Sequence, residues 1–226
     1  MSMRVLIAGA GRAGLSVAVH LQAMGHRVIV IDREEAVSKR AFEHHGLISF
    51  AGDATGAALL REAEVSRCDV VVAMLRRDAD NLAVALLAQA GGAKRVMVRM
   101  RDPEYKSVYL AAGINRILSE IDVFVGALAT AIEHEAVRHS MVLGSGESVA
   151  FELTIPHEAM VVGVTVSDMA SYPDFPSSCV IAGMLEADGV VQAPRGSSIV
   201  TGGMTVLLVA RRGDLGDAID FFMRAK

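Results

Sequence analysis

A pattern typical of a buried strand runs directly into a glycine-rich turn near the start of this chain. The stretch reads Val5-Leu6-Ile7-Ala8-Gly9-Ala10-Gly11-Arg12-Ala13-Gly14. It predicts a strand, a tight turn and a helix whose N-terminus binds the phosphates of a nucleotide. In this role Gly9 allows the reversal, Gly11 lets a pyrophosphate approach the backbone, and Gly14 lets the helix pack on the strand.

The residues after the turn fit the same interpretation. A helical pattern over residues 13–24 ends at Gly25, and a second apolar run over residues 27–31 ends at Asp32. An acid about 20 residues after the turn is expected to accept the hydroxyls of an adenosine ribose. The alternative is that Asp32 only caps the next helix. Its charge disfavours a ribose 2′-phosphate, although Arg33 could offset this, so NAD(H) or an adenine nucleotide is favoured over NADP.

Composition limits the class of protein. The chain has 226 residues, of which 52% are hydrophobic and only 4% aromatic, and its formal net charge is −4. A negative charge and few aromatic side chains argue against nucleic-acid binding, which needs a basic face or stacking platforms. We expect no transmembrane helix and no signal peptide. Because Cys68 and Cys179 form no disulfide framework, we expect a cytoplasmic protein.

Strand and helix patterns alternate through the first part of the chain. Apolar runs end near residues 8, 31, 50, 74, 100 and 118, and each is followed by a helical pattern. This alternation predicts an α/β fold, a Rossmann-like doubly wound parallel sheet. A long helix is expected over residues 121–139, either packed on its own sheet or crossing to another subunit. With this crossover helix, the first domain is predicted to cover residues 1–140.

The pattern changes in the last third of the chain. Residues 144–148 are expected to form a flexible linker, and a small C-terminal α+β domain is predicted over residues 141–226. Asp188-Gly189 is a hairpin signal between two of its strands. The expected helices cover residues 165–170 and 215–223, and the expected strands cover residues 149–155, 160–162, 180–186, 190–192 and 204–210.

Residues for catalysis are hard to find in this sequence. A dehydrogenase would need an acid or base beside its substrate, yet Tyr105 and Tyr109 have no lysine four residues on. Two histidines, His134 and His139, are five residues apart, which does not place them on one helix face for zinc. The sequence also has no P-loop. These observations favour a binding protein over an enzyme, with no metal site, although a small NAD-dependent oxidoreductase remains an alternative.

The motifs together resemble one family, the TrkA-type RCK proteins, which regulate potassium uptake and potassium channels in the cytosol. The resemblance rests on the glycine-rich turn, Asp32, Gly52-Asp53-Ala54-Thr55, Asp78-x-x-Asn81, Arg99-x-Arg101-Asp102-Pro103-Glu104-Tyr105 and Ala112-Gly113-Ile114-Asn115-Arg116-Ile117. It continues more weakly at residues 162–169 and 194–204, which are similar to the C-terminal lobe of the family. There, Gly203-Met204 stands where a Gly-Asp pair is usual.

The resemblance implies a set of ligand contacts. It places Arg12 near the phosphates, Asp32 on the ribose, and Asp53 with Ala54 by the adenine. Leu75 and Arg76 would follow the crevice, and Arg99 with Glu120 would lie at its far end or near a neighbouring subunit's ligand; for this last pair, simple surface ion pairing is the alternative. The candidate binding residues are Gly9, Gly11, Arg12, Ala13, Gly14, Asp32, Arg33, Asp53, Ala54, Leu75, Arg76, Arg99 and Glu120.

The resemblance also implies a role without catalysis. Family members bind NAD(H) or ATP/ADP, pair through the crossover helix, assemble into rings and pass the ligand state to a membrane pore. The chain is therefore expected to be a cytoplasmic regulatory subunit, held at the membrane by a potassium channel or transporter. Its own partner copies would form a homodimer within a larger ring. A nucleotide sensor with another partner is the remaining alternative.

Overall fold

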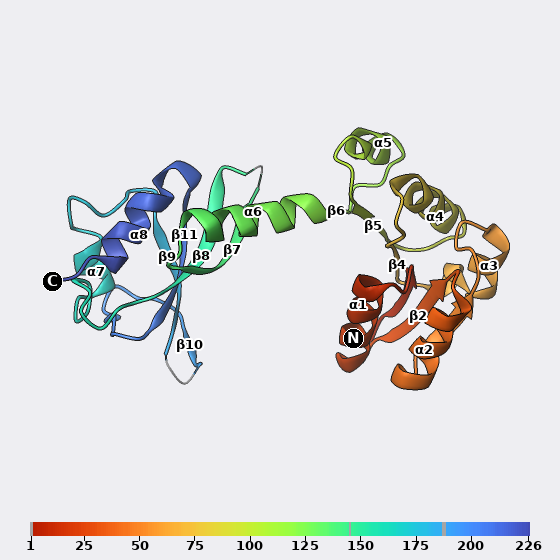
Figure 1. Ribbon diagram of the computed structural model, residues 1–226, viewed down its shortest axis with the longest axis horizontal. Coiled ribbons are helices and arrows are strands. Elements are labelled where there is room, and N and C mark those ends of the chain that lie inside the picture. Colours follow the sequence, from red (N-terminus) through yellow and green to blue (C-terminus); the bar gives the residue numbers. More distant parts are fainter. Residues whose placement is uncertain (1, 145, 187–188) are drawn as a thin grey trace. The chain divides into compact units, whose positions relative to one another are not determined.

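The computed structural model describes residues 2–144, 146–186 and 189–226 (Figure 1). The chain folds into two compact units, Met1–Ile121 and Asp122–Lys226. The first holds a parallel sheet with helices on both faces, and the second holds an antiparallel sheet. The α/β fold expected from the alternating patterns is therefore confirmed for the first unit, and a small α+β unit follows it.

The first unit alternates strands and helices as the sequence predicts. Its strands are β1 (Arg4–Ala8), β2 (Arg27–Asp32), β3 (Ile48–Ala51), β4 (Val70–Ala73), β5 (Val96–Met100) and β6 (Ile117–Ser119). Its helices are α1 (Arg12–Ala23), α2 (Glu35–His45), α3 (Ala57–Glu62), the short 3-10 helix η1 (Val65–Arg67), α4 (Asp78–Ala90) and α5 (Tyr105–Ala111). The next helix, α6 (Glu120–Glu133), starts in this unit and continues into the second.

The strand order of this sheet is β3-β2-β1-β4-β5-β6, and all neighbouring pairs are parallel. The order reverses direction between β1 and β4. At such a switch point the two crossover connections lead away on opposite faces, which leaves the carboxyl ends of the strands open to a ligand. The glycine-rich turn follows β1 directly, so it lies at this switch point.

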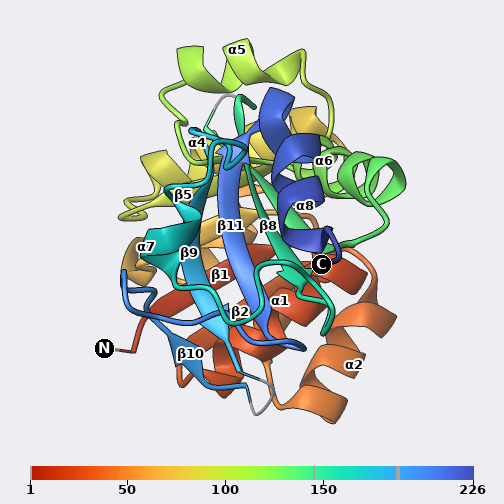
Figure 2. The same ribbon diagram turned by 90° about the vertical axis from the view of Figure 1, so that its left-hand side faces the viewer.

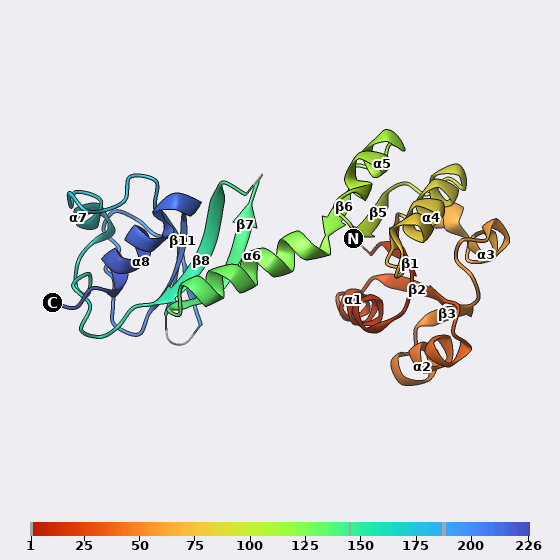
Figure 3. The same cartoon turned by 45° about the horizontal axis from the view of Figure 1, so that its top comes forward.

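Alternating side chains of the strands fill two separate cores. Val5, Ile7 and Val30 pack with Ala18 of α1 and Ala41 of α2 on one face of the sheet. On the other face, Leu6 and Ala8 of β1 and Ile31 of β2 pack with residues of α3, α4 and α5, namely Leu60, Val84 and Tyr109. Figure 3 shows α1 and α2 on the opposite side of the strands from α3 and α4. Because both faces are covered, the strands need continuous apolar runs.

The second unit is built on a five-stranded antiparallel sheet of order β10-β9-β11-β8-β7. Its elements are β7 (Val137–Leu143), β8 (Ser148–Thr154), α7 (Val166–Met169), β9 (Val180–Leu185), β10 (Val191–Gln192), β11 (Thr205–Arg211), η2 (Arg212–Asp214) and α8 (Leu215–Met223). Figure 2 shows β11 between β9 and β8. Phe221 and Phe222 of α8 are buried in one core with Phe151 of β8 and Leu208 of β11.

Three predicted elements of the second unit are wrong. The helix expected over residues 121–139 ends at Glu133, and residues 137–143 form β7 instead. The expected linker at residues 144–148 includes residue 145, which is outside the described residues. Strand β7 ends at Leu143 and pairs there with Ser148, the first residue of β8, and Gly144 and Gly146 between the strands have positive φ. Residues 160–162 are in turns instead of a strand. In the expected Asp188-Gly189 hairpin, Asp188 is outside the described residues, although β9 and β10 do pair antiparallel.

These differences move the division of the chain. The compact units divide between Ile121 and Asp122, whereas the sequence predicted domains of residues 1–140 and 141–226. The physical reason is the pairing of β7 with β8, which joins residues 137–143 to the second sheet. A hairpin of this kind depends on contacts between two segments, which a helical stripe in one segment does not reveal.

Candidate nucleotide-binding site

The glycine-rich turn is held tightly against its neighbours. Gly9 has a φ of +103°, and a Cβ added there would lie 2.8 Å from the carbonyl oxygen of Met74. A Cβ on Gly14 would overlap the carbonyl oxygen of Gly9 itself. The N–H of Gly9 donates to the carbonyl of Ile31 at 2.8 Å. Two of the three glycines are thus required by the backbone packing of the turn, as the motif predicts.

Gly11 differs from the other two glycines. A Cβ added to it would meet no atom within 4 Å, and its backbone is extended with a φ of −60°. Gly11 is also the N-cap of α1, where no side chain accepts a hydrogen bond from the helix and no acid stands in the first turn. The open space and the positive end of the helix fit a phosphate group. A phosphate would supply the negative charge and the hydrogen-bond acceptors that no side chain supplies at this helix N-terminus.

Asp32 points its carboxylate back at the turn. Its Oδ2 accepts a hydrogen bond from the N–H of Ala10 at 2.8 Å, and its Oδ1 accepts one from the N–H of Glu34 at 3.0 Å. The N-cap of α2 is Glu34, and no side chain caps that helix. Asp32 therefore does not cap it, and the alternative considered for this acid is wrong. Each carboxylate oxygen retains a free lone pair, which fits the ribose hydroxyls expected here.

Three further candidates flank these residues at the surface. Arg12 and Ala13, the first two residues of α1, are exposed, and Arg33 is exposed beside Asp32. Their positions suit the phosphate end and the ribose end of a dinucleotide, respectively. Their contacts with a ligand stay predictions.

The Asp53-Ala54 pair follows β3 at the same edge of the sheet. The carboxylate of Asp53 accepts hydrogen bonds from the N–H of Thr55 at 2.9 Å and from its hydroxyl at 2.7 Å. These bonds, with a smaller contribution from the nearby charge of Arg33, hold the pKa of Asp53 below its usual value. Ala54 is buried in the core, packed among apolar side chains of that face. The N-cap of α3 is Gly56, and no side chain caps this helix.

Asn81 fixes the backbone at the end of β4. This residue of α4 is fully buried, and its Oδ1 accepts from the N–H of Leu75 at 2.7 Å. Its Nδ2 donates to the carbonyl of Leu75 at 3.2 Å and to the carbonyl of Arg99 at 3.0 Å. One amide thus joins the segment after β4 to Arg99 of β5. Arg76 follows Leu75 with an exposed side chain.

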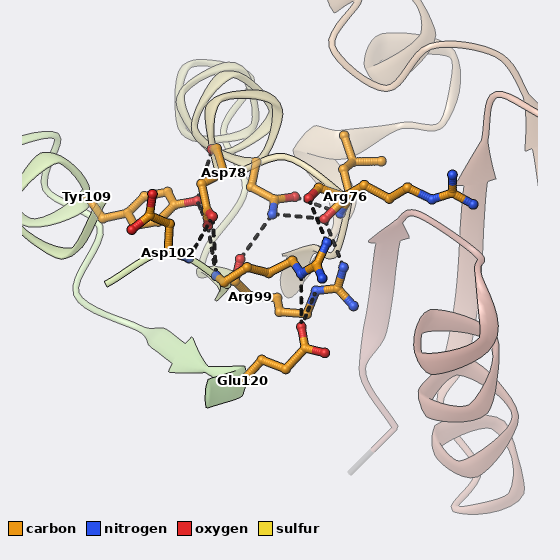
Figure 4. A network of polar contacts seen from close by, with 9 residues as sticks. Arg76, Asp78, Arg99, Asp102, Tyr109 and Glu120 are labelled. Atoms are coloured by element: carbon orange, nitrogen blue, oxygen red, sulfur yellow. Dashed lines mark hydrogen bonds and ion pairs between the residues drawn. The ribbon is translucent and has the colours of Figure 1, made fainter. Parts of the chain in front are cut away.

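The side chain of Asp78 fixes the backbone of the loop after β5. It is buried at the start of α4, and its carboxylate accepts from the N–H groups of Arg101 and Asp102 at distances of 3.0 to 3.3 Å. The Tyr109 hydroxyl, also buried, donates to this carboxylate at 3.0 Å (Figure 4). Burial, and secondly the hydrogen bond to Asp78, raise the pKa of Tyr109 well above its usual value. The hydroxyl therefore stays a donor.

Arg99 and Glu120 lie against each other. Glu120 Oε2 is 3.6 Å from Arg99 Nε and 3.4 Å from Arg101 Nε (Figure 4). The Arg99 guanidinium also donates from Nη2 to the carbonyl of Leu75 at 3.0 Å, and Arg101 Nη1 donates to the carbonyl of Arg76 at 3.3 Å. The alternative of an ion pair for Arg99 and Glu120 therefore holds in this structure, and any role in ligand binding must act through that pair.

Four residues of this network were absent from the candidates drawn from the sequence: Asp78, Asn81, Arg101 and Tyr109. Two of them had a signal, because an acid and an amide three residues apart on the buried face of an apolar helix need polar partners. The sequence could not show that these partners are backbone groups of the neighbouring strands.

The histidine segment near the end of α6 lies partly in a strand. His139 lies in β7, where its Nδ1 is 3.0 Å from Glu152 Oε2 of β8. Residues 137–143 form a strand, so His139 does not lie on a helix. Within residues 2–144, 146–186 and 189–226, no group of three or more His, Cys, Asp or Glu side chains is placed to hold a metal ion. Over the same residues, none of the helices has both the length and the apolar character that crossing a membrane requires.

Known proteins resemble this chain in sequence. A "Trk system potassium uptake protein TrkA homolog" of Methanothermobacter thermautotrophicus is 30% identical over 168 residues, which cover 74% of this chain and 77% of the relative. A protein of the same description from Archaeoglobus fulgidus is 30% identical over 225 residues, covering 94% of this chain but only 48% of the relative. The chain thus spans about half the length of the second protein.

Solved structures share the fold. The structure "GsuK channel bound to NAD" matches all of this chain and 40% of its own chain, with a TM-score of 0.66 and 17% identity. "Crystal structure of the GsuK bound to ADP" matches 60% of this chain and 36% of its own, with a TM-score of 0.52 and 18% identity. At these identities the likeness concerns the architecture alone.

The sequence profile of one family, the TrkA-N domain, matches residues 5–120. These residues include β1 to β6, the glycine-rich turn, Asp32 and the network around Asn81. They make up just over half of the 226 residues, and the Methanothermobacter relative shares 30% identity over most of both chains. The chain belongs to the TrkA-N domain family.

Proposed function

We propose that this protein is a cytosolic nucleotide-sensing regulatory subunit of a potassium channel or potassium uptake transporter, without an enzymatic activity of its own. The observation that carries the proposal is the open helix N-terminus at Gly11, with the Asp32 carboxylate bonded to the same turn. The names of the relatives, Trk potassium uptake proteins, support the potassium system as the one it serves.

The proposed ligand is NAD(H) or ATP/ADP. A ribose in this site would lie against the Asp32 carboxylate, whose charge repels a 2′-phosphate and so disfavours NADP. The solved structures with this fold include one described as bound to NAD and one described as bound to ADP, which supports both classes. The candidate set named from the sequence stays the proposed site, in which Glu120 affects the ligand through its ion pair with Arg99 and not by direct contact.

We further propose that the protein acts at the cytoplasmic face of the membrane, through a membrane-embedded channel or transporter subunit. Its copies would pair along α6 and assemble into a larger ring. Support for pairing comes from large apolar side chains exposed on this helix, namely Ile121, Val123, Phe124, Val125, Leu128 and Ile132. An apolar face of this size is unusual on the surface of a monomer.

Binding without turnover is the test of the nucleotide proposal. Purified protein is heated with NAD+, NADH, NADP+, ATP or ADP, and a bound nucleotide raises the melting temperature by mass action. Asp32→Asn is the diagnostic variant because it keeps an oxygen for the buried N–H of Ala10, which Asp32→Ala would leave without an acceptor. Glu34→Gln is the matched control, since no capping bond depends on that neighbouring side chain.

The expected result is a shift with one nucleotide class that shrinks in Asp32→Asn and persists in Glu34→Gln. No shift with any of the five nucleotides would exclude the nucleotide site. Oxidation or reduction of a substrate by NAD(H) at an ordinary enzymatic rate would replace the regulatory function by that of an oxidoreductase. Co-purification with a membrane protein other than a potassium channel or transporter would exclude the potassium system and support the alternative function of a nucleotide sensor with another partner.

A further inference from the structure

Two arginines share one carboxylate at the carboxyl edge of the parallel sheet. The same oxygen of Glu120 faces the Nε of Arg99 at 3.6 Å and the Nε of Arg101 at 3.4 Å. Both distances exceed those of charge-assisted hydrogen bonds, which are about 2.7 to 2.9 Å. Two positive charges face one negative charge, so the pair keeps an excess of positive charge that a more highly charged anion would neutralise better.

The Arg99 side chain is also incompletely satisfied. Only 16% of it is exposed, and its Nε is buried with no hydrogen-bond partner among the described residues. A buried donor without an acceptor is costly. Glu120 is near enough to attract this atom but too far to accept its proton in a hydrogen bond. A phosphate oxygen placed against this guanidinium would supply the missing acceptor.

Arg99 and Arg101 form hydrogen bonds with backbone carbonyls of the segment after β4, which lies beside the glycine-rich turn. Arg99 donates to the carbonyl of Leu75 and Arg101 donates to that of Arg76. The N–H nitrogen of Leu75 is 3.2 Å from the place where a Cβ on Gly9 would lie. The nucleotide turn and the arginine pair are thus connected through two consecutive residues after β4, and both lie at the edge where ligands bind in such sheets.

We propose that Glu120 occupies the pair Arg99 and Arg101 as an internal substitute for a ligand phosphate, and that an anionic ligand at the nucleotide site displaces it. The proposal rests on the function proposed above and adds its regulation. Glu120 is the first residue of α6, the helix that leads into the second unit. Displacement therefore releases the start of this helix from the strand ends that bind the ligand.

The effect of a Glu120 substitution on ligand affinity distinguishes this exchange from a direct contact. If Glu120 competes with phosphate, removing its charge strengthens binding, whereas a Glu120 that contacts the ligand would weaken binding when removed. We expect Glu120→Gln to bind ADP about two- to fivefold more tightly, the range of a partly exposed ion pair. The gain shrinks in the double variant Glu120→Gln with Arg101→Gln, because the competition acts through the arginines.

Isothermal titration of the full chain with ADP, and separately with inorganic pyrophosphate, tests the proposal. Glu133→Gln, at the other end of α6, is the matched control and should leave both affinities unchanged. Unchanged or weaker ADP binding by Glu120→Gln, or an equal gain in the control, overturns the proposal. Tighter pyrophosphate binding by Glu120→Gln without any ADP binding would keep the exchange and exclude the nucleotide function. If Glu120→Gln binds neither probe, both are wrong.

Hydrogen exchange gives the second readout. In the wild type, ADP should increase amide exchange in the first two turns of α6, since the anchoring of Glu120 is lost. In Glu120→Gln this exchange should already be raised without ADP and should change little when ADP is added. ADP binding to the wild type with no change in these amides would show that the ligand leaves Glu120 in place, which overturns the release of the helix.

Discussion

The side-chain amide of Asn81 forms a hydrogen bond with both backbone polar groups of Leu75, accepting from its N–H at 2.7 Å and donating to its carbonyl at 3.2 Å. Asn81 is fully buried, and its second donor hydrogen is used by the carbonyl of Arg99. The amide therefore links Leu75, two residues after β4, to Arg99 of β5, just beyond Ala73 and Val98, the last pair of residues in the ladder between these strands.

The variant Asn81→Ala should destabilise this edge of the sheet. It leaves the N–H of Leu75 and the carbonyl of Arg99 without the partner they have in the wild type, at a cost of about 1 to 3 kcal/mol for each buried group that stays unsatisfied. Native-state hydrogen exchange of the β4 and β5 amides measures the loss. Asn115→Ala, an exposed position in the same unit, should change exchange little. Equal protection in both variants would show that Asn81 is not needed.

Alanine at two glycines of the turn should have different effects: Gly14→Ala should mainly lower stability, and Gly11→Ala should mainly lower nucleotide affinity. Gly14→Ala forces a Cβ onto the carbonyl of Gly9, a backbone atom that cannot move alone, so the first unit should lose several kcal/mol of stability or fail to fold. Gly11→Ala has open space and should cost less than about 1 kcal/mol, the range of a changed N-cap. The same methyl group should obstruct a phosphate and lower nucleotide affinity about tenfold. Thermal melts and titrations separate the two effects, and normal affinity of Gly11→Ala would contradict the proposed phosphate position.

Tyr109→Phe should weaken the loop after β5. The variant keeps the buried ring but removes the donor to Asp78, at an expected cost of about 1 to 3 kcal/mol. Chemical denaturation followed by circular dichroism measures it, with Tyr105→Phe as the control of similar chemistry. Because the pKa of Tyr109 is raised in the folded state, its contribution to stability is complete below about pH 10 and declines above it. The variant should lack that alkaline decline.

A second alkaline effect is expected in the other unit. Burial raises the pKa of the Cys179 thiol from 9.0 to about 11. Between these values the unfolded chain has lost the thiol proton and the folded chain retains it, so the free energy of unfolding falls as pH rises. The slope attributable to this group is at most about 1.4 kcal/mol per pH unit. Denaturation of wild type and Cys179→Ala at pH 8 and pH 10, under reducing conditions, should show a smaller decline in the variant; equal declines would contradict it.

Pairing along α6 predicts the effect of a charge on its exposed face. Ile132 and Phe124 are 75% and 65% exposed, values that are costly for such side chains in a lone copy. Ile132→Glu should shift the protein from dimer to monomer in size-exclusion chromatography with light scattering. Glu133→Gln beside it should not. A wild-type protein that is already monomeric at micromolar concentration would exclude this surface as the dimer contact.

The six-stranded sheet was predictable from the sequence because its strands are buried on both faces. Each strand is then a continuous apolar run, and turns with positive φ carry glycine at Gly9, Gly25 and Gly46, whereas Glu64, with a φ of 55°, is an exception in this unit. The glycine-rich turn and Asp32 were predictable for the same reason, since their residue types are dictated by local backbone geometry. The structure places both as the motif requires.

Strand β7 was not predictable in this way. Its residues 137–143 continue the apolar spacing of α6 with no glycine or proline between them, and only pairing with β8 makes them a strand. The roles of Asn81 and Asp78 were hidden for a related reason. Their bonds go to backbone groups of residues 75 and 99 to 102, and backbone groups have the same chemistry whatever the sequence.

Because Asn81 and Asp78 hold main-chain atoms, the backbone around Leu75, Arg76 and Asp102 does not depend on these three side chains alone, although Leu75 packs partly against the core and Asp102 accepts a hydrogen bond from the N–H of Glu104. Substitutions at these three positions can alter the shape and charge presented to a ligand while the strand ends stay where they are. The first unit is therefore a promising scaffold for engineering: a library varied at these positions, with residues 78 and 81 kept constant, should yield many folded members with different ligand preferences.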